Sequence, residues 1–504
     1  MFRKTLKHFK FLNNERGSIL IISYFVIVLL LGISEAFILV TANEARLAER
    51  ERLTTVAFHV AEAGIERGLY DLRQDFVNAV GTPSWSDGNV NGYMIGPNSA
   101  SYYTIPYSST ALNDGSYTVQ LKNDGSQNIW LQARGTISGV TQTITVYVKM
   151  VDLSPWRNVI FAGAGASGQM VNGNVDIRGS VHILGTGLAP GDFAINMGGT
   201  AQLVGNNYTG IPAALSAKAP ALPTTVFNGE TVETLNAVLR VKHGVVGVSG
   251  SASVGEANVA GNSTKETVDA VYVTDGYGGN QGTGGVFSDN GTTNAYDLGD
   301  AVSFPSLNTP YQGYATYKDY LKANALVVSS ASELNTLANL TPNSNFSLSN
   351  AKGSISMDGN GNMAVSGIVY VDNSGDLKMD KAGSNKTINY TGKGSLLVTG
   401  NVGINVNLVT SGNNSFPDKI MGIMTPNVIT FNEASINVMG LFFAEDKVVA
   451  QKQTNIMGSL VSNYFDMGTN VPAIFQVPAT LNNMPPGMIG SNSLWYLVVA
   501  WIKS

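Results

Sequence analysis

Residues 19–40 form a nearly continuous apolar stretch, which limits the possible folds of this chain more than any other feature. As an α-helix the stretch would extend about 33 Å, close to the roughly 30 Å hydrocarbon core of a bilayer. The segment before it is basic, with Arg3, Lys4, Lys7, Lys10 and Arg16 against the single acid Glu15. This charge bias predicts a membrane-inserted helix from Ile19 to Val40, with a cytoplasmic N-terminus and an exported remainder.

The apolar stretch could instead belong to a cleaved signal peptide, with Val40-Thr41-Ala42 as the cleavage site. Its length argues against this, because signal peptides have apolar cores of only about 7–15 residues. The pattern beyond it also remains helical, with apolar residues three or four apart at Phe58, Ala61, Ile65, Leu69, Leu72 and Phe76. We therefore expect one helix over residues 18–76.

Three features of this region occur in order: a basic leader ending in Arg16-Gly17, an apolar start from Ser18 to Ile22, and the stretch Ala61-Glu62-Ala63-Gly64. Over about residues 1–75 the sequence resembles PilX-type minor pilins of type IV pili. The resemblance implies that residues 1–17 are a leader and that a prepilin peptidase cuts between Gly17 and Ser18. It also implies methylation of the new amine, other pilins and the pilus assembly platform as partners, and passage from the inner membrane to a pilus or the cell surface.

One position departs from the family pattern. Most pilins have a glutamate five residues after the cut, where it neutralises the N-terminal amine of a neighbouring subunit, but this chain has Ile22. An unpaired charge in apolar surroundings costs several kcal/mol. Glu35 lies more than two helical turns further along and cannot replace the missing acid. The resemblance therefore implies a place at the fibre tip or in the initiation complex.

Composition narrows the class of protein further. The chain has 504 residues, a net charge of -5 and only 13% charged residues, so a basic nucleic-acid footprint is absent outside the leader. It has no cysteine, which excludes disulfides and thiolate chemistry. Glycine is abundant at 56 residues. A weakly charged exported chain without disulfides needs an extensive hydrogen-bonded scaffold, which favours a β-rich body.

After the helix, the pattern predicts a small antiparallel sheet within residues 77–153. Residues 77–116 are interpreted as a loop, and apolar residues then alternate with polar ones from Tyr117 to Lys149. The sequences Asn123-Asp124-Gly125 and Ser138-Gly139 are typical of the turns that join antiparallel strands.

Residues 154–490 are interpreted as a parallel β-helix. Segments 175–180, 436–441 and 454–459 share a pattern that ends in glycine followed by one more residue, and Gly422, Gly440 and Gly458 are 18 residues apart. Gly367 and Gly394 mark longer units of 27 and then 28 residues. Such spacing is typical of stacked rungs, although a β-sandwich with glycine-rich loops is an alternative. Rungs are expected over 157–205 and 350–465, with an insertion at about 206–349 and a C-terminal strand or cap at 491–504.

The fold class expected is therefore an α+β module, made of a long helix and a small antiparallel sheet, followed by a mainly-β parallel β-helix domain with an insertion. Within the insertion, Tyr311, Tyr314, Tyr317 and Tyr320 have helical spacing. Such tyrosines usually pack on a sheet, but they could also stack on sugar rings.

Candidate chemistry in the body is sparse. Asp289, Asp297 and Asp300 gather oxygen ligands of the kind calcium prefers, but solvated turns explain them too. Paired carboxylates on one face of a β-helix could cleave polysaccharide, and the best candidates are Asp358, Asp372, Asp376 and Asp380. His182 falls in an apparent rung and is interpreted as a surface residue or a hydrogen-bonded residue rather than a ligand. No cofactor is expected.

The leading hypothesis is a minor pilin-like component of a type IV pilus, at the tip or in the initiation complex, which presents a large extracellular β-helix for assembly or surface adhesion and is not an enzyme. The alternative is a membrane-anchored β-helix protein that binds or cleaves extracellular polysaccharide. A third hypothesis is a surface adhesin that works without a pilus.

Overall fold

The computed structural model divides the chain into two compact units: Met1–Val151 with Leu494–Ser504, and Asp152–Ser493, which we call the body. The structure describes residues 15–78, 89–94, 101–123, 129–152, 154–164, 175–189, 192–227, 229–256, 264–265, 271–274, 277–278, 286–288, 303–467, 472–490 and 494–503.

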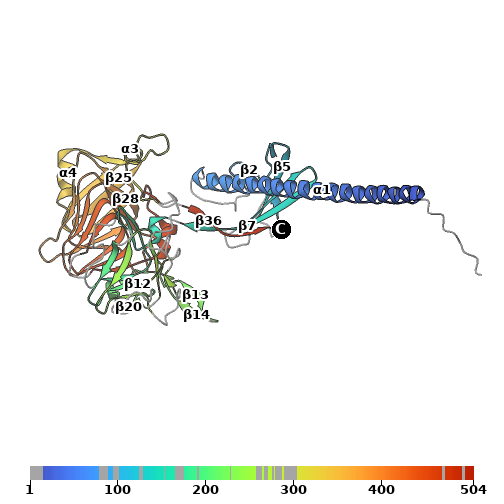
Figure 1. Ribbon diagram of the computed structural model, residues 1–504. Coiled ribbons are helices and arrows are strands. Elements are labelled where there is room, and N and C mark those ends of the chain that lie inside the picture. The colour runs from blue at the N-terminus through green and yellow to red at the C-terminus, as the bar shows by residue number, and fades with distance from the viewer. Residues whose placement is uncertain are drawn as a thin grey trace, which may run out of the picture. The chain divides into compact units, whose positions relative to one another are not determined.

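The first unit is built on one helix, α1 (Glu15–Asn78), which extends the predicted range of 18–76 at both ends (Figure 1). Its C-terminal half buries the face that carries Ala57, Ala61, Ile65, Leu69 and Leu72. These side chains recur three or four residues apart, so one face of the helix meets the sheet.

An antiparallel sheet covers that face of α1, with the hairpin turn at Ser138-Gly139 as predicted. Both turn residues have positive φ angles, 47° and 79°, which suits a tight two-residue turn. The inward residues of the sheet alternate with outward ones and form the core with α1. The strands of this unit are β1 Asn89–Val90, β2 Tyr93–Met94, β3 Tyr103–Thr104, β4 Ala111–Leu112, β5 Gly115–Asn123, β6 Ile129–Ile137, β7 Val140–Asp152 and β36 Leu494–Lys503.

Two features of this sheet differ from expectation. Residues 77–116 were expected to form a loop, but β3 and β4 both pair with β5. The C-terminal strand β36 pairs with β7, so it completes the sheet of the first unit after the whole body has intervened. Sequence pattern identifies a strand at 494–503 but not its partner, because pairing across such a distance leaves no local trace.

The body is mainly a stack of parallel strands, although residues 345–367 pair antiparallel within the range 350–465 where rungs were expected. With the helix and the antiparallel sheet it confirms the predicted fold class. Its helices are η2 Pro155–Arg157, α2 Ala213–Ser216, α3 Tyr317–Ala323, α4 Ala331–Ala338 and η4 Pro478–Asn483. Its strands are β8 Ile160–Ala164, β9 Asp176–Arg178, β10 Val181–Thr186, β11 Phe193–Met197, β12 Gln202–Gly205, β13 Thr224–Phe227, β14 Glu230–Glu233, β15 Leu239–Val241, β16 Val245–Val248, β17 Ser253–Val254, β18 Thr264–Lys265, β19 Val271–Thr274, β20 Tyr277–Gly278, β21 Val286–Ser288, β22 Leu326–Val328, β23 Asn345–Ser349, β24 Gly353–Asp358, β25 Asn362–Val371, β26 Leu377–Met379, β27 Thr387–Thr391, β28 Lys393–Val398, β29 Val402–Ile404, β30 Asn407–Thr410, β31 Ile420–Thr425, β32 Val428–Phe431, β33 Ile436–Ala450, β34 Thr454–Asp466 and β35 Ala473–Phe475.

The first strand of the body, β8, lies in the middle of the stack and not at one end. Along one face the strands lie in the order β22, β25, β28, β31, β33, β34, β8, β10, β15, so β8 pairs with the much later β34. One continuous core of Val, Ile, Leu, Met and Phe side chains fills the stack. The early and late parts of the body therefore depend on each other at the β8–β34 junction.

The glycine pattern read from the sequence largely matches the strand register. Gly440 pairs with Gly458 and Gly367 with Gly394, as predicted. Gly179 belongs to the same pattern, and its φ of 134° resembles the 152° and 138° of Gly440 and Gly458. Gly422, however, pairs with Leu441 rather than with Gly440, and Gly394 pairs with Met421. The predicted spacings at Gly422 are thus wrong by one residue.

The parallel stack reaches further than residues 157–205 and 350–465. Strands β15 to β17, within the expected insertion at 206–349, pair in parallel with β10, β11 and β12. Strand β22 likewise pairs in parallel with β25. These strands are only two to four residues long, too short for their repeat to be recognised from sequence.

Two outer faces of the stack are covered by chain segments. Residues 484–490 lie across the β28–β31 region, where the Trp156 indole N–H donates to the Ile489 carbonyl at 2.6 Å and Tyr317 Oη to the Gly487 carbonyl at 3.2 Å. A Cβ at Gly422 would overlap the Met488 sulfur, so glycine makes room for this segment. On another face, the segment that contains Tyr208 covers β35, with 6.5 Å between the ring centres of Tyr208 and Phe475.

Candidate membrane and assembly interface

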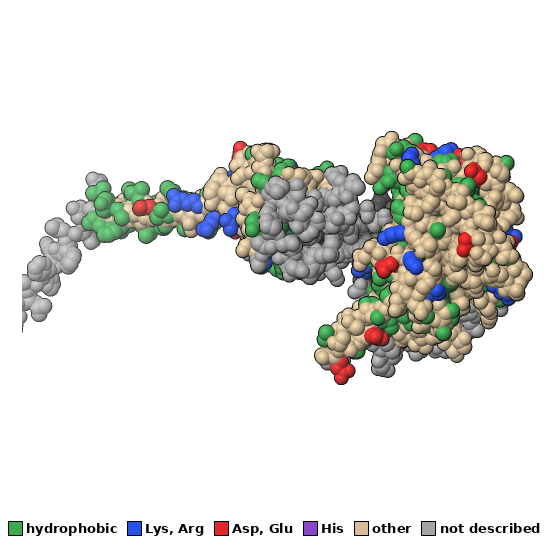
Figure 2. Space-filling view, turned by 180° about the vertical axis from the view of Figure 1, so that it is seen from behind, with side chains coloured by type: hydrophobic (Ala, Val, Ile, Leu, Met, Phe, Trp, Pro, Cys, Tyr) green, Lys and Arg blue, Asp and Glu red, His purple; other side chains and the backbone are tan. Residues whose placement is uncertain are grey.

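The N-terminal half of α1 exposes its apolar side chains. From Ile19 to Val40 the large hydrophobic residues are 43–74% exposed, and Figure 2 shows them as a hydrophobic sleeve on the helix. By length and composition, this is the one helix in the described part of the chain able to cross a membrane. An apolar surface of this size needs either lipid or other apolar helices around it.

The predicted processing bond lies in the first turn of α1, because the helix begins at Glu15 and so includes Gly17 and Ser18. Ile22, at the position where pilins carry glutamate, is 59% exposed and belongs to the apolar surface. Glu35 is exposed on the same helix. The described part of the helix therefore offers no acid near Ser18 on its C-terminal side.

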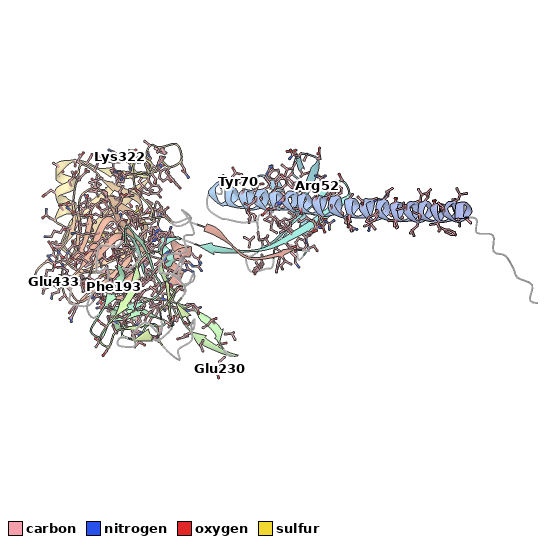
Figure 3. All side chains as sticks on the ribbon, in the orientation of Figure 1. Arg52, Tyr70, Phe193, Glu230, Lys322 and Glu433 are labelled. Atoms are coloured by element: carbon pink, nitrogen blue, oxygen red, sulfur yellow. The ribbon has the colours of Figure 1, made fainter. Side chains whose placement is uncertain are left out.

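Charged side chains follow the apolar half and pair along the helix itself. The guanidinium of Arg52, which Figure 3 labels, lies 2.7 Å from the Glu49 carboxylate, and His59 Nδ1 lies 3.1 Å from Glu62 Oε2. Both pairs are largely exposed, so each contributes little to stability. The first pair lies between the apolar half and the sheet-packed half, and the second lies on the exposed side of the sheet-packed half.

The Ala61-Glu62-Ala63-Gly64 stretch brings α1 close to the sheet. Ala61 is fully buried, and a Cβ at Gly64 would lie 3.0 Å from the Cβ of Ala133 on β6. Opposite them, a Cβ at Gly135 would overlap the backbone of Ala57 and Ala61. Small residues on both sides let the helix backbone and the strand backbone touch. The feature that carries the family resemblance therefore has a structural role in this contact.

Half-buried Arg67 and buried Asp71 on α1 form a polar cluster with residues that precede β5. Asp71 is 2% exposed, accepts from Arg67 at 3.3 Å, and also accepts from the Asn91 amide at 2.8 Å. The Arg67 guanidinium lies 4.7 Å from the centre of the Tyr107 ring. The i,i+4 spacing of the two charges was the available signal. The cluster fastens α1 to the strands and loops before β5.

The four candidate carboxylates of the body do not converge on one site. Asp358 accepts from the backbone N–H groups of Asn360 and Asn362 and from the Asn362 amide, and these hydrogen bonds lower its pKa to about 2. Asp372 pairs with Lys322 at 2.6 Å, which lowers the pKa of Asp372.

The other two carboxylates, Asp376 and Asp380, also serve local structure. Asp376 accepts from the Asn401 backbone N–H at 2.6 Å, and Asp380 contacts Lys378 and the Asn405 amide, each at 2.7 Å. Asp358 and Asp376 line two different grooves, and neither groove is lined by a second of the four acids.

The structure does not describe the three aspartates that were considered as calcium ligands. Asp289, Asp297 and Asp300 lie outside the described residues. Among the residues that are described, no group of three or more His, Asp or Glu side chains is arranged to hold a metal ion. Structural calcium therefore stays a prediction.

His182 is buried, so it is not the surface residue or the hydrogen-bonded residue that was expected. It is 1% exposed, its ring lies 5.0 Å from that of Phe161, and its Nε2 has no hydrogen-bond partner among the described residues. Burial, together with the nearby charges of Arg240 and Lys242, lowers its pKa to about 3. The ring is neutral at ordinary pH.

The four tyrosines form one aromatic cluster, but only part of it is helical. α3 begins at Tyr317, whereas Tyr311 and Tyr314 pair with each other in a short turn. Tyr311 lies 4.7 Å from Tyr317 and 4.8 Å from Tyr320 between ring centres. Both contacts of Tyr311 are edge-to-face, with an angle of 67° between the ring planes, so the tyrosines pack mainly on one another.

The fold is similar to the crystal structure of the competence-associated pilin ComZ from Thermus thermophilus, with 18% sequence identity and a TM-score of 0.48. The alignment covers 90% of this chain and 97% of that one. No protein-family model matches the sequence, and no curated protein does. Function is therefore argued from the chain's own residues.

Proposed function

We propose that this chain is a PilX-type minor pilin that enters a type IV pilus and carries the body as an extracellular module. The observation that carries the proposal is α1, a single helix with an exposed apolar half and a half that packs on an antiparallel sheet. Such a helix can reside in a bilayer and later exchange lipid for the apolar helices of other subunits. The prepilin peptidase, the assembly platform and other pilins are the partners this requires.

The missing acid at Ile22 supports a place at the tip or in the initiation complex. The Ser18 amine produced by cleavage needs a carboxylate when it is buried among apolar helices. Because Ile22 is not an acid, this chain cannot supply a carboxylate to the amine of a subunit above it. The chain therefore fits best where no further subunit follows. The body, with its many rungs, would also hinder close stacking within a fibre shaft.

The processing claim is tested by intact-mass analysis of the protein from its native membrane. The expected product begins at Ser18 with one added methyl group. A Gly17→Glu variant should retain the leader, whereas Gly32→Ala, where an added Cβ meets nothing within 4 Å, should be processed normally. A mature N-terminus at Asn43, or an uncut leader in the wild-type protein, would contradict the proposal.

The location is tested by immunogold labelling of the body on native pili. One cluster of label at a fibre end supports the tip, and label spaced along the fibre contradicts it. A strain that lacks the assembly ATPase distinguishes the adhesin hypothesis. If the protein still mediates surface binding there, it works without a pilus.

Catalysis on polysaccharide gains no support from the four carboxylates, each of which is held in local structure. Glycan cleavage that is lost in Asp372→Ala or Asp376→Ala would revive that alternative. The expectation that the chain is not an enzyme stays a prediction.

A further inference from the structure

One outer face of the body is left open by the covering segments. We call open face the outer surface of β26, β29 and β32, with residues 447–450 of β33 and 464–466 of β34. On the covered faces even outward-pointing residues are buried, as Phe443, Phe161 and Met457 are. On the open face, Lys378 and Asp376 are exposed, and Thr430 is half-buried.

The open face repeats in register from rung to rung. Its central row runs Lys378, Gly403, Thr430, Val449 and Asp466, each aligned with the next across a parallel pairing. Neighbouring strands lie about 4.8 Å apart. A polymer that lies along the stack would therefore meet side chains at regular intervals.

A groove of about 250 Å³ lies at one end of this row. Amide, hydroxyl and charged side chains dominate its lining, and Gly403 leaves space in its floor. A Cβ there would contact only Lys378 Cγ, at 3.4 Å. The polar residues that line the groove are Asp376, Lys378, Asn401, Asn405, Thr430 and Asn432.

Two lysines at the groove and its margin are paired within the protein. Lys378 lies 2.7 Å from Asp380, and Lys381 lies 3.4 Å from Glu433, which Figure 3 labels. Asp376 accepts from the Asn401 backbone N–H, and further along the face the Gln451 amide donates to Asp466 at 2.9 Å. The face therefore has no excess of positive charge and does not attract strongly anionic ligands.

We propose that the open face binds a neutral, hydroxyl-rich glycan chain along the direction of the stack. Nucleic acid would need a basic surface, and a protein partner would need an apolar and aromatic centre. The amides, hydroxyls and paired charges of the groove instead match the alternating donors and acceptors of sugar hydroxyls. Binding at this face requires no catalytic step and is independent of whether the chain enters a pilus.

The test uses the full chain in a detergent without a sugar headgroup, with chitin, cellulose and dextran as neutral probes and polygalacturonate and duplex DNA as anionic ones. The wild-type protein should bind at least one neutral probe and neither anionic probe. Gly403→Leu, which fills the groove floor, should weaken that binding by at least about tenfold. Thr430→Val, which removes one hydroxyl, should weaken it less.

The matched control is Ser347→Leu, which adds the same side chain at an exposed position of β23, outside the open face. It should change binding by less than about twofold. Circular dichroism and thermal unfolding identify any variant that fails to fold. No binding to a neutral probe, binding only to an anionic one, or equal binding by wild type and folded Gly403→Leu would each overturn the proposal. Pilus assembly is measured in a separate experiment. If the chain does not enter a pilus, the glycan-binding result can still be interpreted.

Discussion

Gly458 lies directly beside Gly440 on the next rung, so close that a Cβ added to Gly458 would overlap the Gly440 carbonyl oxygen. Both glycines have positive φ angles, 138° and 152°. The close approach of the two backbones and their positive φ angles therefore both require glycine, at two positions that are 18 residues apart. This pair explains why a glycine repeat is visible in the sequence.

We expect Gly458→Ala to destabilise the body by roughly 2–4 kcal/mol, because the strands must separate and the new side chain is strained at this φ. Hydrogen exchange of peptides from β33 and β34 would measure the loss. Gly403→Ala is the control, since its Cβ enters open space, and it should change protection little. Equal protection in both variants would contradict this account of the repeat.

Gly135→Ala should separate α1 from β6, because the added Cβ overlaps the helix backbone at Ala57 and Ala61. A cost of about 1–3 kcal/mol is expected from this overpacking. Exchange protection in peptides of β6 would report it. Arg134→Ala changes the neighbouring, exposed residue and should have little effect, so similar losses in the two variants would argue against the close helix–strand contact.

Arg178→Ala should be among the most damaging charge deletions in the body. Arg178 is 5% exposed and bonds to Asp176 at 2.7 Å, to Gln202 at 2.8 Å and to Glu256. Its removal leaves the partly buried carboxylates of Asp176 and Glu256 without their cation, which costs up to about 3–5 kcal/mol. Lys381→Ala breaks the more exposed pair with Glu433 and should cost less than about 1 kcal/mol.

The loss in Arg178→Ala should also depend on pH. Burial already raises the pKa of Asp176, and without the guanidinium the folded protein would hold a proton there more readily. Stability of the variant should therefore fall as pH rises from acid to neutral. Urea denaturation at pH 4.5 and pH 7 would show a smaller deficit at the lower pH. A deficit independent of pH would mean that lost packing, not charge, dominates.

His182 should make the body acid-sensitive. Its pKa is about 3 in the folded protein, against 6.5 for an ordinary histidine, so only the unfolded chain takes up the proton between these values. Stability is fully present above about pH 6.5 and falls by up to about 1.4 kcal/mol per unit as pH drops toward 3. Urea denaturation from pH 7 to pH 4 would measure the slope. His182→Leu should reduce it, whereas His59→Gln should not.

The sequence was most informative where a pattern of residue types repeats over a short stretch. The helix followed from the periodicity around Ile65, the hairpin from Ser138-Gly139, and the rung register from Gly440 and Gly458. Each rests on contacts between residues near in sequence, or on a backbone conformation that only certain residues adopt. Such constraints are visible in composition and spacing.

What the sequence did not reveal depends on contacts between distant segments. The one-residue error at Gly422 arises because this glycine makes room for Met488 rather than marking a rung corner. The open face is also a consequence of distant segments, since it is defined by which other faces they cover. The partners of Arg67 and Asp71 are likewise distant in sequence, since Asn91 donates to Asp71 and Arg67 donates to Tyr93.

The pairing of β36 with β7 has a consequence for biosynthesis. As the chain is made, β7 appears before the body and waits with an unpaired edge until β36 emerges after it. A polypeptide truncated within the body keeps its apolar anchor but cannot finish the sheet that supports the anchor. Only a chain that has been made through the whole body can therefore complete the sheet of the first unit.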